Sequence, residues 1–302
     1  MTGISVIIPT YNRASFLDRA LNSVRCQTFA CGEILVIDDG STDETVQVVT
    51  AFTKECSIPV RYFFQSNRGP ASARNVGIQE ATYSNVAFLD SDDHWQKKKL
   101  QLQFRELEAN PETLISHTGE RWYRRGVHLN QKKKHKPQNG DIFRNCLQLC
   151  SVGMSTVMAR KKLFDKIGLF DERLHCCEDY ELWLRASCRF PFLLVDAPLT
   201  IKEGGRADQV SYTYRVGMDK LRIWAMMNLL QNVKLTRDQV FMTFQELHQK
   251  CTVYGNGCIK HGRLAEGELY TNCANWAEAY INKGFALPVT VPQKLINSLV
   301  IE

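Results

Sequence analysis

Three carboxylates follow an apolar run in residues 86–93, Val-Ala-Phe-Leu-Asp-Ser-Asp-Asp. Asp90, Asp92 and Asp93 therefore lie at the end of a segment that is apolar enough to be a buried strand. Several acids at the end of a core strand are costly unless something positive binds there. Oxygen ligands suit Mg2+ and Mn2+, which commonly carry a nucleotide diphosphate. A turn or helix cap uses one Asp and does not need three, so the cluster favours a divalent-cation site.

The segments around this cluster alternate between strand and helix. Capping-box patterns begin at Ser15 and at Ser41, and each precedes a segment with a helical apolar period. Alternation at this spacing predicts an α/β fold with a mostly parallel central sheet and helices on both faces. The apolar, β-branched runs predict strands at residues 4–8, 34–37, 60–64 and 86–89.

Polar residues follow three of these four strands directly. They occupy residues 9–13, 38–41 and 90–93. In sheets of this kind ligands bind at the carboxyl ends of the strands, and these ends meet at one edge. The sequence therefore predicts one site built from three strand ends.

The chain changes character in its last third. Further strands are predicted at 114–117, 155–158 and 199–201, with helices at 161–167 and 178–187, whereas helix-like segments alone follow Gly204-Gly205. We expect a boundary near residue 215, with a domain over 1–215 and a C-terminal helical region over 216–302. Within the domain, a donor half would cover about 1–95 and an acceptor half about 96–215.

Composition is ordinary for a globular protein of 302 residues, with 44% hydrophobic and 23% charged residues. No apolar stretch is long enough to span a membrane, and the N-terminus carries no basic leader. We therefore expect a cytoplasmic protein. Contact with the cytosolic face of a membrane stays open. The 11 cysteines are an odd number without paired Cys-x-x-Cys spacing. Buried reduced thiols are therefore favoured over a zinc site.

Five motifs occur in chain order in the first two thirds of the chain. They are Ser-Val-Ile-Ile-Pro-Thr-Tyr-Asn-Arg at 5–13, Glu-Ile-Leu-Val-Ile-Asp-Asp-Gly-Ser-Thr-Asp at 33–43, Asn-Arg-Gly-Pro-Ala-Ser-Ala-Arg-Asn at 67–75, Phe-Leu-Asp-Ser-Asp-Asp at 88–93 and Glu-Asp-Tyr-Glu-Leu-Trp-Leu-Arg at 178–185. Together they closely resemble the family-2 glycosyltransferases of the GT-A fold. The resemblance implies a Rossmann-like GT-A domain that moves a sugar from a nucleotide-diphospho-sugar, most often UDP-linked, to a hydroxyl acceptor with inversion at the anomeric carbon.

The same resemblance implies where the nucleotide binds. Pro9, Tyr11 and Arg13 would line the base and ribose pocket, and Asp39 would accept a hydrogen bond from the uracil or the ribose. Tyr11 offers a flat face for a base, and Asp39 is an acceptor-only carboxylate. The structural alternatives are a half-buried aromatic at Tyr11 and a turn-forming residue at Asp39.

The diphosphate and its cation are implied by three further positions. Arg74 would contact the nucleotide or its phosphates, with a surface ion pair as the alternative. Asp90 would face the ribose or the metal, and Asp92 would ligate Mn2+ or Mg2+ between the two phosphates. Arg206 follows the Gly204-Gly205 hinge and suits a loop that closes over the diphosphate. Some relatives have a metal-binding His in this region, but residues 202–209 contain none.

The acid pair Glu178-Asp179 matches the catalytic motif of the family. By this resemblance Asp179 is the base that takes the proton of the acceptor hydroxyl, and Glu178 positions it or the acceptor. The alternative is that both acids favour a helix N-terminus through its dipole.

The segment 121–136 carries seven Lys or Arg residues and no acid, so the net charge of +6 is local. Such a segment can bind a glycan or phosphorylated lipid-linked acceptor, a membrane face or RNA, of which RNA is the weaker choice. It can equally be a solvated loop without a ligand. Trp95 can stack on an acceptor or pack in the core. The predicted acceptor residues are Trp95, Arg121, Trp122, Arg124 and Arg125.

Two other functions stay open. A nucleotidyltransferase would be expected to carry a glycine-rich phosphate loop after the first strand, where this chain has Pro-Thr-Tyr-Asn-Arg. A non-catalytic adaptor that binds RNA or a carrier on the same fold would not need Asp90, Asp92 and Asp179.

Overall fold

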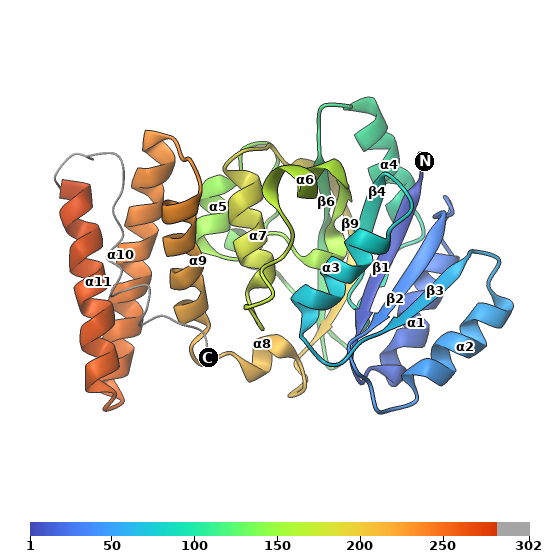
Figure 1. Ribbon diagram of the computed structural model, residues 1–302, viewed down its shortest axis with the longest axis horizontal. Coiled ribbons are helices and arrows are strands. Elements are labelled where there is room, and N and C mark those ends of the chain that lie inside the picture. The colour runs from blue at the N-terminus through green and yellow to red at the C-terminus, as the bar shows by residue number, and fades with distance from the viewer. Residues whose placement is uncertain (283–302) are drawn as a thin grey trace.

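The computed structural model describes residues 1–282, so the last part of the predicted C-terminal region, 283–302, lies outside the described residues. The chain has the predicted α/β architecture, with one central sheet and a separate stack of C-terminal helices beside it (Figure 1). Across residues 1–282 the strands are β1 Ile4–Thr10, β2 Glu33–Asp38, β3 Val60–Phe64, β4 Asn85–Phe88, β5 His94–Trp95, β6 Ile115–Arg124, β7 Val127–Leu129, β8 Met158–Arg160 and β9 Leu193–Gly204.

Helices connect and cover these strands. Two short 3-10 helices, η1 Lys133–His135 and η2 Met154–Thr156, accompany them. The α-helices are α1 Ala14–Arg25, α2 Thr45–Glu55, α3 Pro70–Glu80, α4 Lys99–Ala109, α5 Phe143–Gln148, α6 Lys162–Ile167, α7 Glu178–Ser187, α8 Val210–Thr213, α9 Met218–Asn232, α10 Arg237–Lys260 and α11 Leu264–Asn282.

The sheet has the strand order β3-β2-β1-β4-β8-β6-β9-β5, and β7 pairs with β6 as a hairpin. The pairs β2–β3, β1–β2 and β1–β4 are parallel, as the strand–helix alternation predicts. β8 is antiparallel to both β4 and β6, whereas β6 and β9 are again parallel. The carboxyl ends of β1, β2 and β4 therefore lie at one edge.

Alternate residues of the parallel strands bury two different cores. Val6 and Ile8 pack with residues of α1 and α2 on one face. Ile7 and Leu35 pack with α3 on the other face. Gly77 allows α3 to approach β1 closely, because a Cβ there would lie 2.4 Å from the Ile7 side chain. A strand that is buried at every position, such as β1, is thus explained by helices on both faces.

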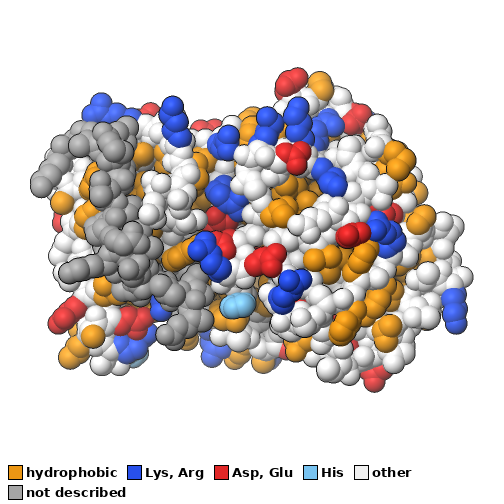
Figure 2. All heavy atoms as spheres, viewed as in Figure 1, with side chains coloured by type: hydrophobic (Ala, Val, Ile, Leu, Met, Phe, Trp, Pro, Cys, Tyr) orange, Lys and Arg blue, Asp and Glu red, His pale blue; other side chains and the backbone are white. Residues whose placement is uncertain are grey.

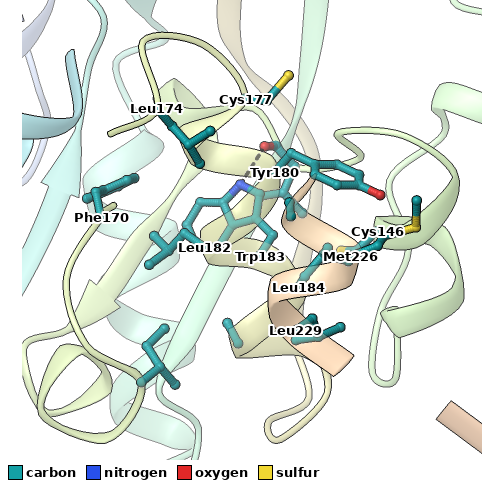
Figure 3. Close-up of a cluster of buried hydrophobic side chains, with 14 of the residues drawn as sticks. Cys146, Phe170, Leu174, Cys177, Tyr180, Leu182, Trp183, Leu184, Met226 and Leu229 are labelled. Atoms are coloured by element: carbon teal, nitrogen blue, oxygen red, sulfur yellow. Dashed lines mark hydrogen bonds between the residues drawn. The ribbon is translucent and has the colours of Figure 1, made fainter. Parts of the chain in front are cut away.

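The α3 side of the sheet continues into the C-terminal helices. One cluster of buried side chains runs from β1 and α3 through α7 to α9, α10 and α11. Figure 3 shows its centre, where Tyr180 and Trp183 of α7 lie against Met226 and Leu229 of α9. The Trp183 indole donates a hydrogen bond to the Val152 carbonyl at 2.9 Å, which satisfies its one polar group.

Some local predictions were wrong. Ser15 lies inside α1, and Ser41 caps no helix. The Asp43 carboxylate instead accepts hydrogen bonds from the backbone N–H groups of Ala14 and Thr45, at 3.0 and 3.1 Å. One carboxylate thus satisfies donors at two helix starts, a pairing between segments that a local capping pattern does not contain. The 155–158 strand begins only at Met158, since Ser155 belongs to η2.

Candidate active site

A cavity of about 740 Å³ opens at the carboxyl ends of β1, β2 and β4. Its wall also includes the start of α3, the β6–β7 hairpin, the start of α7, the end of β9 and the first turns of α9. Figure 2 shows acidic and basic side chains close together between the sheet and the C-terminal helices. The structure therefore brings the predicted strand ends together with segments up to about 200 residues away.

The acidic turn after β4 is held by Ser155 of η2. The Ser155 hydroxyl accepts from the Asp90 backbone N–H at 3.0 Å and donates to Asp93 Oδ2 at 2.7 Å. Asp93 is buried, and burial together with the nearby Asp92 and Asp90 raises its pKa well above the usual value. Asp93 is therefore a supporting residue of the turn, and Asp90 and Asp92 are the more exposed members.

A buried arginine links the acidic turn to the acid pair of α7. Arg74 donates to Asp90 at 2.8 Å and to Glu178 at 2.5 Å. Arg74 is 5% exposed, so the surface ion pair considered from the sequence is wrong. Burial would raise the pKa of Asp90, but the charges of Arg74 and Lys202 outweigh it and lower the pKa. Burial does raise the pKa of Glu178, despite Arg74. Arg74 thus fixes two carboxylates of the cavity wall relative to each other.

Asp179 is the half-buried member of the acid pair and lines the cavity. Its Oδ1 accepts from the Tyr180 backbone N–H at 2.7 Å, and its Oδ2 accepts from the Cys150 thiol at 3.0 Å. Burial and the neighbouring Asp179 raise the pKa of Cys150 well above its ordinary value, so the thiol stays protonated. Asp179 makes no ion pair with a described residue within 4.0 Å, which distinguishes it from Glu178.

The residues predicted for the nucleotide lie in the cavity wall. Pro9, Tyr11, Arg13 and Asp39 all line it. The ring of Tyr11 is available, since the residue is 47% exposed. Asp39 already accepts from the Arg68 and Gly69 backbone N–H groups at 2.9 and 2.8 Å. Its carboxylate thus anchors the segment before α3 and not its own turn, and a contact between Asp39 and a nucleotide stays a prediction.

The predicted acceptor residues separate into three groups. Trp122 and Arg124, from the β6–β7 hairpin, line the cavity. Arg121 and Arg125 are exposed and lie outside its wall, so only an acceptor that extends beyond the cavity would reach them. Trp95 is 4% exposed and its indole donates to the Ser155 carbonyl at 2.7 Å. Trp95 therefore packs in the core, and the acceptor contact considered for it is contradicted.

Lys202 and Arg206 are the two cations beside the Gly204-Gly205 hinge, and Lys202 lies in the cavity wall. It belongs to β9, which runs on to Gly204, so the predicted mobile loop begins later than expected. The charge of Glu120 raises the pKa of Lys202 against the effect of burial, and Asp93 and Asp90 add to the shift. A fixed cation thus faces the acidic turn.

Other cavity residues were missed because they come from segments without a motif. They are Cys150, His175, Gln209, Tyr214, Met218 and Arg222.

The carboxylates of Asp90 and Asp92 were tested as ligands for a divalent cation. Their side chains are 28% and 17% exposed and both line the cavity. No group of three or more His, Cys, Asp or Glu side chains is gathered for a metal ion within residues 1–282. Mg2+ is usually held by one or two carboxylates together with substrate phosphates, so this pair fits an ion that binds with a diphosphate.

An open α/β sheet with a cavity at the carboxyl ends of its strands is the arrangement in which α/β proteins bind their ligands. The family model described as "Glycosyl transferase family 2" matches residues 5–168. The chain belongs to glycosyl transferase family 2.

Among curated proteins, an uncharacterized glycosyltransferase of Rickettsia felis is 40% identical over 189 residues, which cover 61% of this chain and 30% of that protein. The chain thus aligns with less than a third of the length of this relative.

Solved structures share the fold at low sequence identity. Residues 1–349 of S. aureus TarS in complex with UDP-GlcNAc match with a TM-score of 0.61 at 19% identity, with 97% of this chain and 95% of that fragment covered. The mannosyltransferase PcManGT of Pyrobaculum calidifontis, in complex with GDP-Man and Mn2+, has a TM-score of 0.63 at 16% identity, with 95% and 77% covered. Among residues 1–282 no helix is both long and apolar enough to cross a membrane.

Proposed function

We propose that this chain is an inverting glycosyltransferase that moves a sugar from a UDP-linked donor to a hydroxyl of a glycan or lipid-linked acceptor. The observation that carries the proposal is the position of Asp179, a carboxylate without an ion pair in the same cavity wall as Asp90 and Asp92. Solved neighbours bind UDP-GlcNAc or GDP-Man, which supports a nucleotide-sugar donor. A single base in a single displacement leads to inversion.

The roles follow from the partners of each side chain. Asp179 removes the proton of the acceptor hydroxyl as the bond to the anomeric carbon forms. Glu178 holds Arg74, and Arg74 holds Asp90 toward the donor. Pro9, Tyr11, Arg13 and Asp39 receive the nucleoside.

Asp92 and Asp90 would hold Mn2+ or Mg2+, and PcManGT, which was solved with Mn2+, supports this choice. When bound, such an ion stabilises the charge that develops on the departing diphosphate. Lys202 would stabilise the same charge, because its pKa is raised and it remains cationic.

The acceptor side of the proposal rests on the β6–β7 hairpin. Trp122 and Tyr123 supply flat faces in the cavity, and the exposed Lys and Arg residues of segment 121–136 continue outward from it. This arrangement suits a sugar in the cavity with an anionic carrier beyond it, as in a lipid-linked acceptor at the cytosolic membrane face. Transfer to RNA is the weaker alternative, and it would use the same basic segment.

The test is a donor panel with purified protein. UDP-, GDP- and dTDP-sugars are added with Mn2+ or with EDTA, and thermal stabilisation and donor hydrolysis are measured. We expect one UDP-sugar to raise the melting temperature and to be slowly hydrolysed, and EDTA to weaken both effects. No response to any donor would refute the proposal in favour of a non-catalytic adaptor.

The base is tested with Asp179→Asn, which is nearly isosteric. We expect it to lose at least about 100-fold in turnover, the size of a general-base contribution, while it still binds the donor. Asp196→Asn is the matched control, because Asp196 is an exposed residue of β9 outside the cavity. Full turnover in Asp179→Asn would remove the assignment.

A further inference from the structure

The Asp92 carboxylate already has a cation of its own. Arg206 Nη2 donates to Asp92 Oδ2, and Gln209 Nε2 lies 3.4 Å from the same oxygen. Arg206 makes this contact without forming part of the cavity wall, so it approaches Asp92 from the side of α1. Other side chains hold the guanidinium in place. Its Cζ lies 4.2 Å from the centre of the Phe16 ring, and its Nη1 donates to the Glu203 carbonyl at 3.1 Å.

The neighbours of this pair supply a second position for the guanidinium. Arg206 Nε is buried without a hydrogen-bond partner and lies 3.4 Å from Asp208 Oδ1. Asp208 is 45% exposed on its side chain and also pairs with Arg13. A small rotation about the terminal bonds of Arg206 would therefore exchange Asp92 for Asp208 without leaving the charge unpaired.

We infer that Arg206 is the resident counter-ion of Asp92 and that a divalent cation binds Asp92 only by displacing it. This inference rests on the proposed role of Asp92 as a metal ligand. A divalent cation on either oxygen of the Asp92 carboxylate would lie close to this guanidinium, and positive charges at such a distance repel each other strongly. The apparent affinity of the cation is thus reduced by the stability of the Arg206–Asp92 pair, as for any competing ligand. The displaced guanidinium then pairs with Asp208. Cation binding is therefore coupled to a rearrangement of residues 204–210.

The consequence is that the protein holds a divalent cation weakly until a donor adds its phosphate oxygens. With the diphosphate present, the ion gains ligands that Arg206 does not compete for. Cation and donor should therefore bind cooperatively.

The experiment measures Mn2+ binding directly by electron paramagnetic resonance, without donor or acceptor. Hydrogen bonds between charged groups are typically strong enough for a 10- to 100-fold effect, so we expect Arg206→Gln to bind Mn2+ with a Kd about 10- to 100-fold lower than the unmodified chain. An equal or weaker affinity in Arg206→Gln would overturn the inference, as would a failure of both proteins to bind Mn2+.

Two variants serve as controls. Arg19→Gln removes a positive charge that contacts the Asp92 carbonyl at 3.1 Å but not its carboxylate, and we expect less than a threefold change in Kd. A gain as large as that of Arg206→Gln would show a general charge effect and refute displacement. Asp92→Asn combined with Arg206→Gln should lose the gain, and a retained gain would place the ion elsewhere.

Circular dichroism spectra establish that each variant is folded. Because Mn2+ binding is measured without substrate, failure of this inference is separate from failure of the transferase proposal, which the donor panel tests.

Discussion

Each oxygen of the Asp179 carboxylate has one hydrogen-bond donor, and the two donors differ in kind. The Tyr180 N–H belongs to the first turn of α7, whereas the Cys150 thiol comes from the loop before η2. The first contact is set by the helix itself. The second depends on tertiary packing. A thiol beside the proposed base is thus a positioning group for it, and burial together with the charge of Asp179 raises the pKa of that thiol and keeps it protonated.

Removing the thiol should slow the proposed transfer. In Cys150→Ala the Asp179 Oδ2 loses its hydrogen-bond donor, so the carboxylate is held less firmly in the cavity wall. We expect kcat to fall by about fivefold, since a hydrogen bond contributes about 1 kcal/mol and a thiol is a weak donor. Cys150→Ser keeps a donor and should retain most of the turnover. Equal kcat values in all three proteins would contradict the positioning role.

At the scale of elements, β6 connects the core to the part of the cavity wall that the β6–β7 hairpin forms. Its first half is buried between β8 and β9, and its second half continues into the hairpin with β7. His117 lies in the buried half and is 1% exposed. Its Nε2 lies 2.9 Å from the Gln138 carbonyl, which requires the neutral ring to carry its proton on that nitrogen. Burial lowers the pKa of His117 from 6.5 to about 4.

His117 should therefore make the fold less stable in acid. The unfolded chain binds a proton at this ring below pH 6.5, whereas the folded chain does so only near pH 4. The contribution of His117 to the free energy of unfolding is therefore fully present above pH 6.5 and decreases as the pH falls from 6.5 to 4. The expected loss at pH 5 relative to pH 7.5 is about 2 kcal/mol from this group. Urea unfolding at both pH values should show that His117→Gln loses less stability on acidification. His128→Gln, an exposed control, should behave like the unmodified chain; equal losses in all three proteins would refute the assignment.

At the scale of the whole molecule, the C-terminal helices are continuous with the core of the transferase. The boundary near residue 215 and the division into donor and acceptor halves stay a proposal. The buried cluster crosses that boundary, with Met226 of α9 packed beside Tyr180 and Trp183 of α7 (Figure 3). The segment 216–282 also contributes Met218 and Arg222 to the cavity wall. We propose that this region is an extension that completes the transferase domain and does not unfold separately.

A cavity in this shared core should destabilise the molecule as one unit. Met226 is 0% exposed, so Met226→Ala is expected to lower the free energy of unfolding by about 2–5 kcal/mol. Unfolding followed by tryptophan fluorescence and by circular dichroism should give one coincident transition at lower denaturant concentration. Val253→Ala, at a position of α10 that is 62% exposed, should change the stability by less than about 0.5 kcal/mol. Two separate transitions would show that the helices form an independent domain.

The sequence by itself determined the elements of the fold and the positions of the strand-end residues. Strand periodicity and the order of polar clusters are local patterns, and because parallel strands end at one edge, Asp39, Asp90 and Asp92 had to lie near one another. The start of α7 at Glu178 was likewise found as predicted.

Only the tertiary structure decided which charge faces which carboxylate. Arg206 and Asp92 are 114 residues apart, Arg74 and Glu178 are 104 apart, and Cys150 meets Asp179 across the loop that leads into α7. Such contacts depend on the packing of β9, η2 and α7 around the cavity, and no periodicity encodes them. The same packing buried Trp95 and placed Lys202 in the wall, because the side of a strand that faces a ligand is set by its neighbours in the sheet.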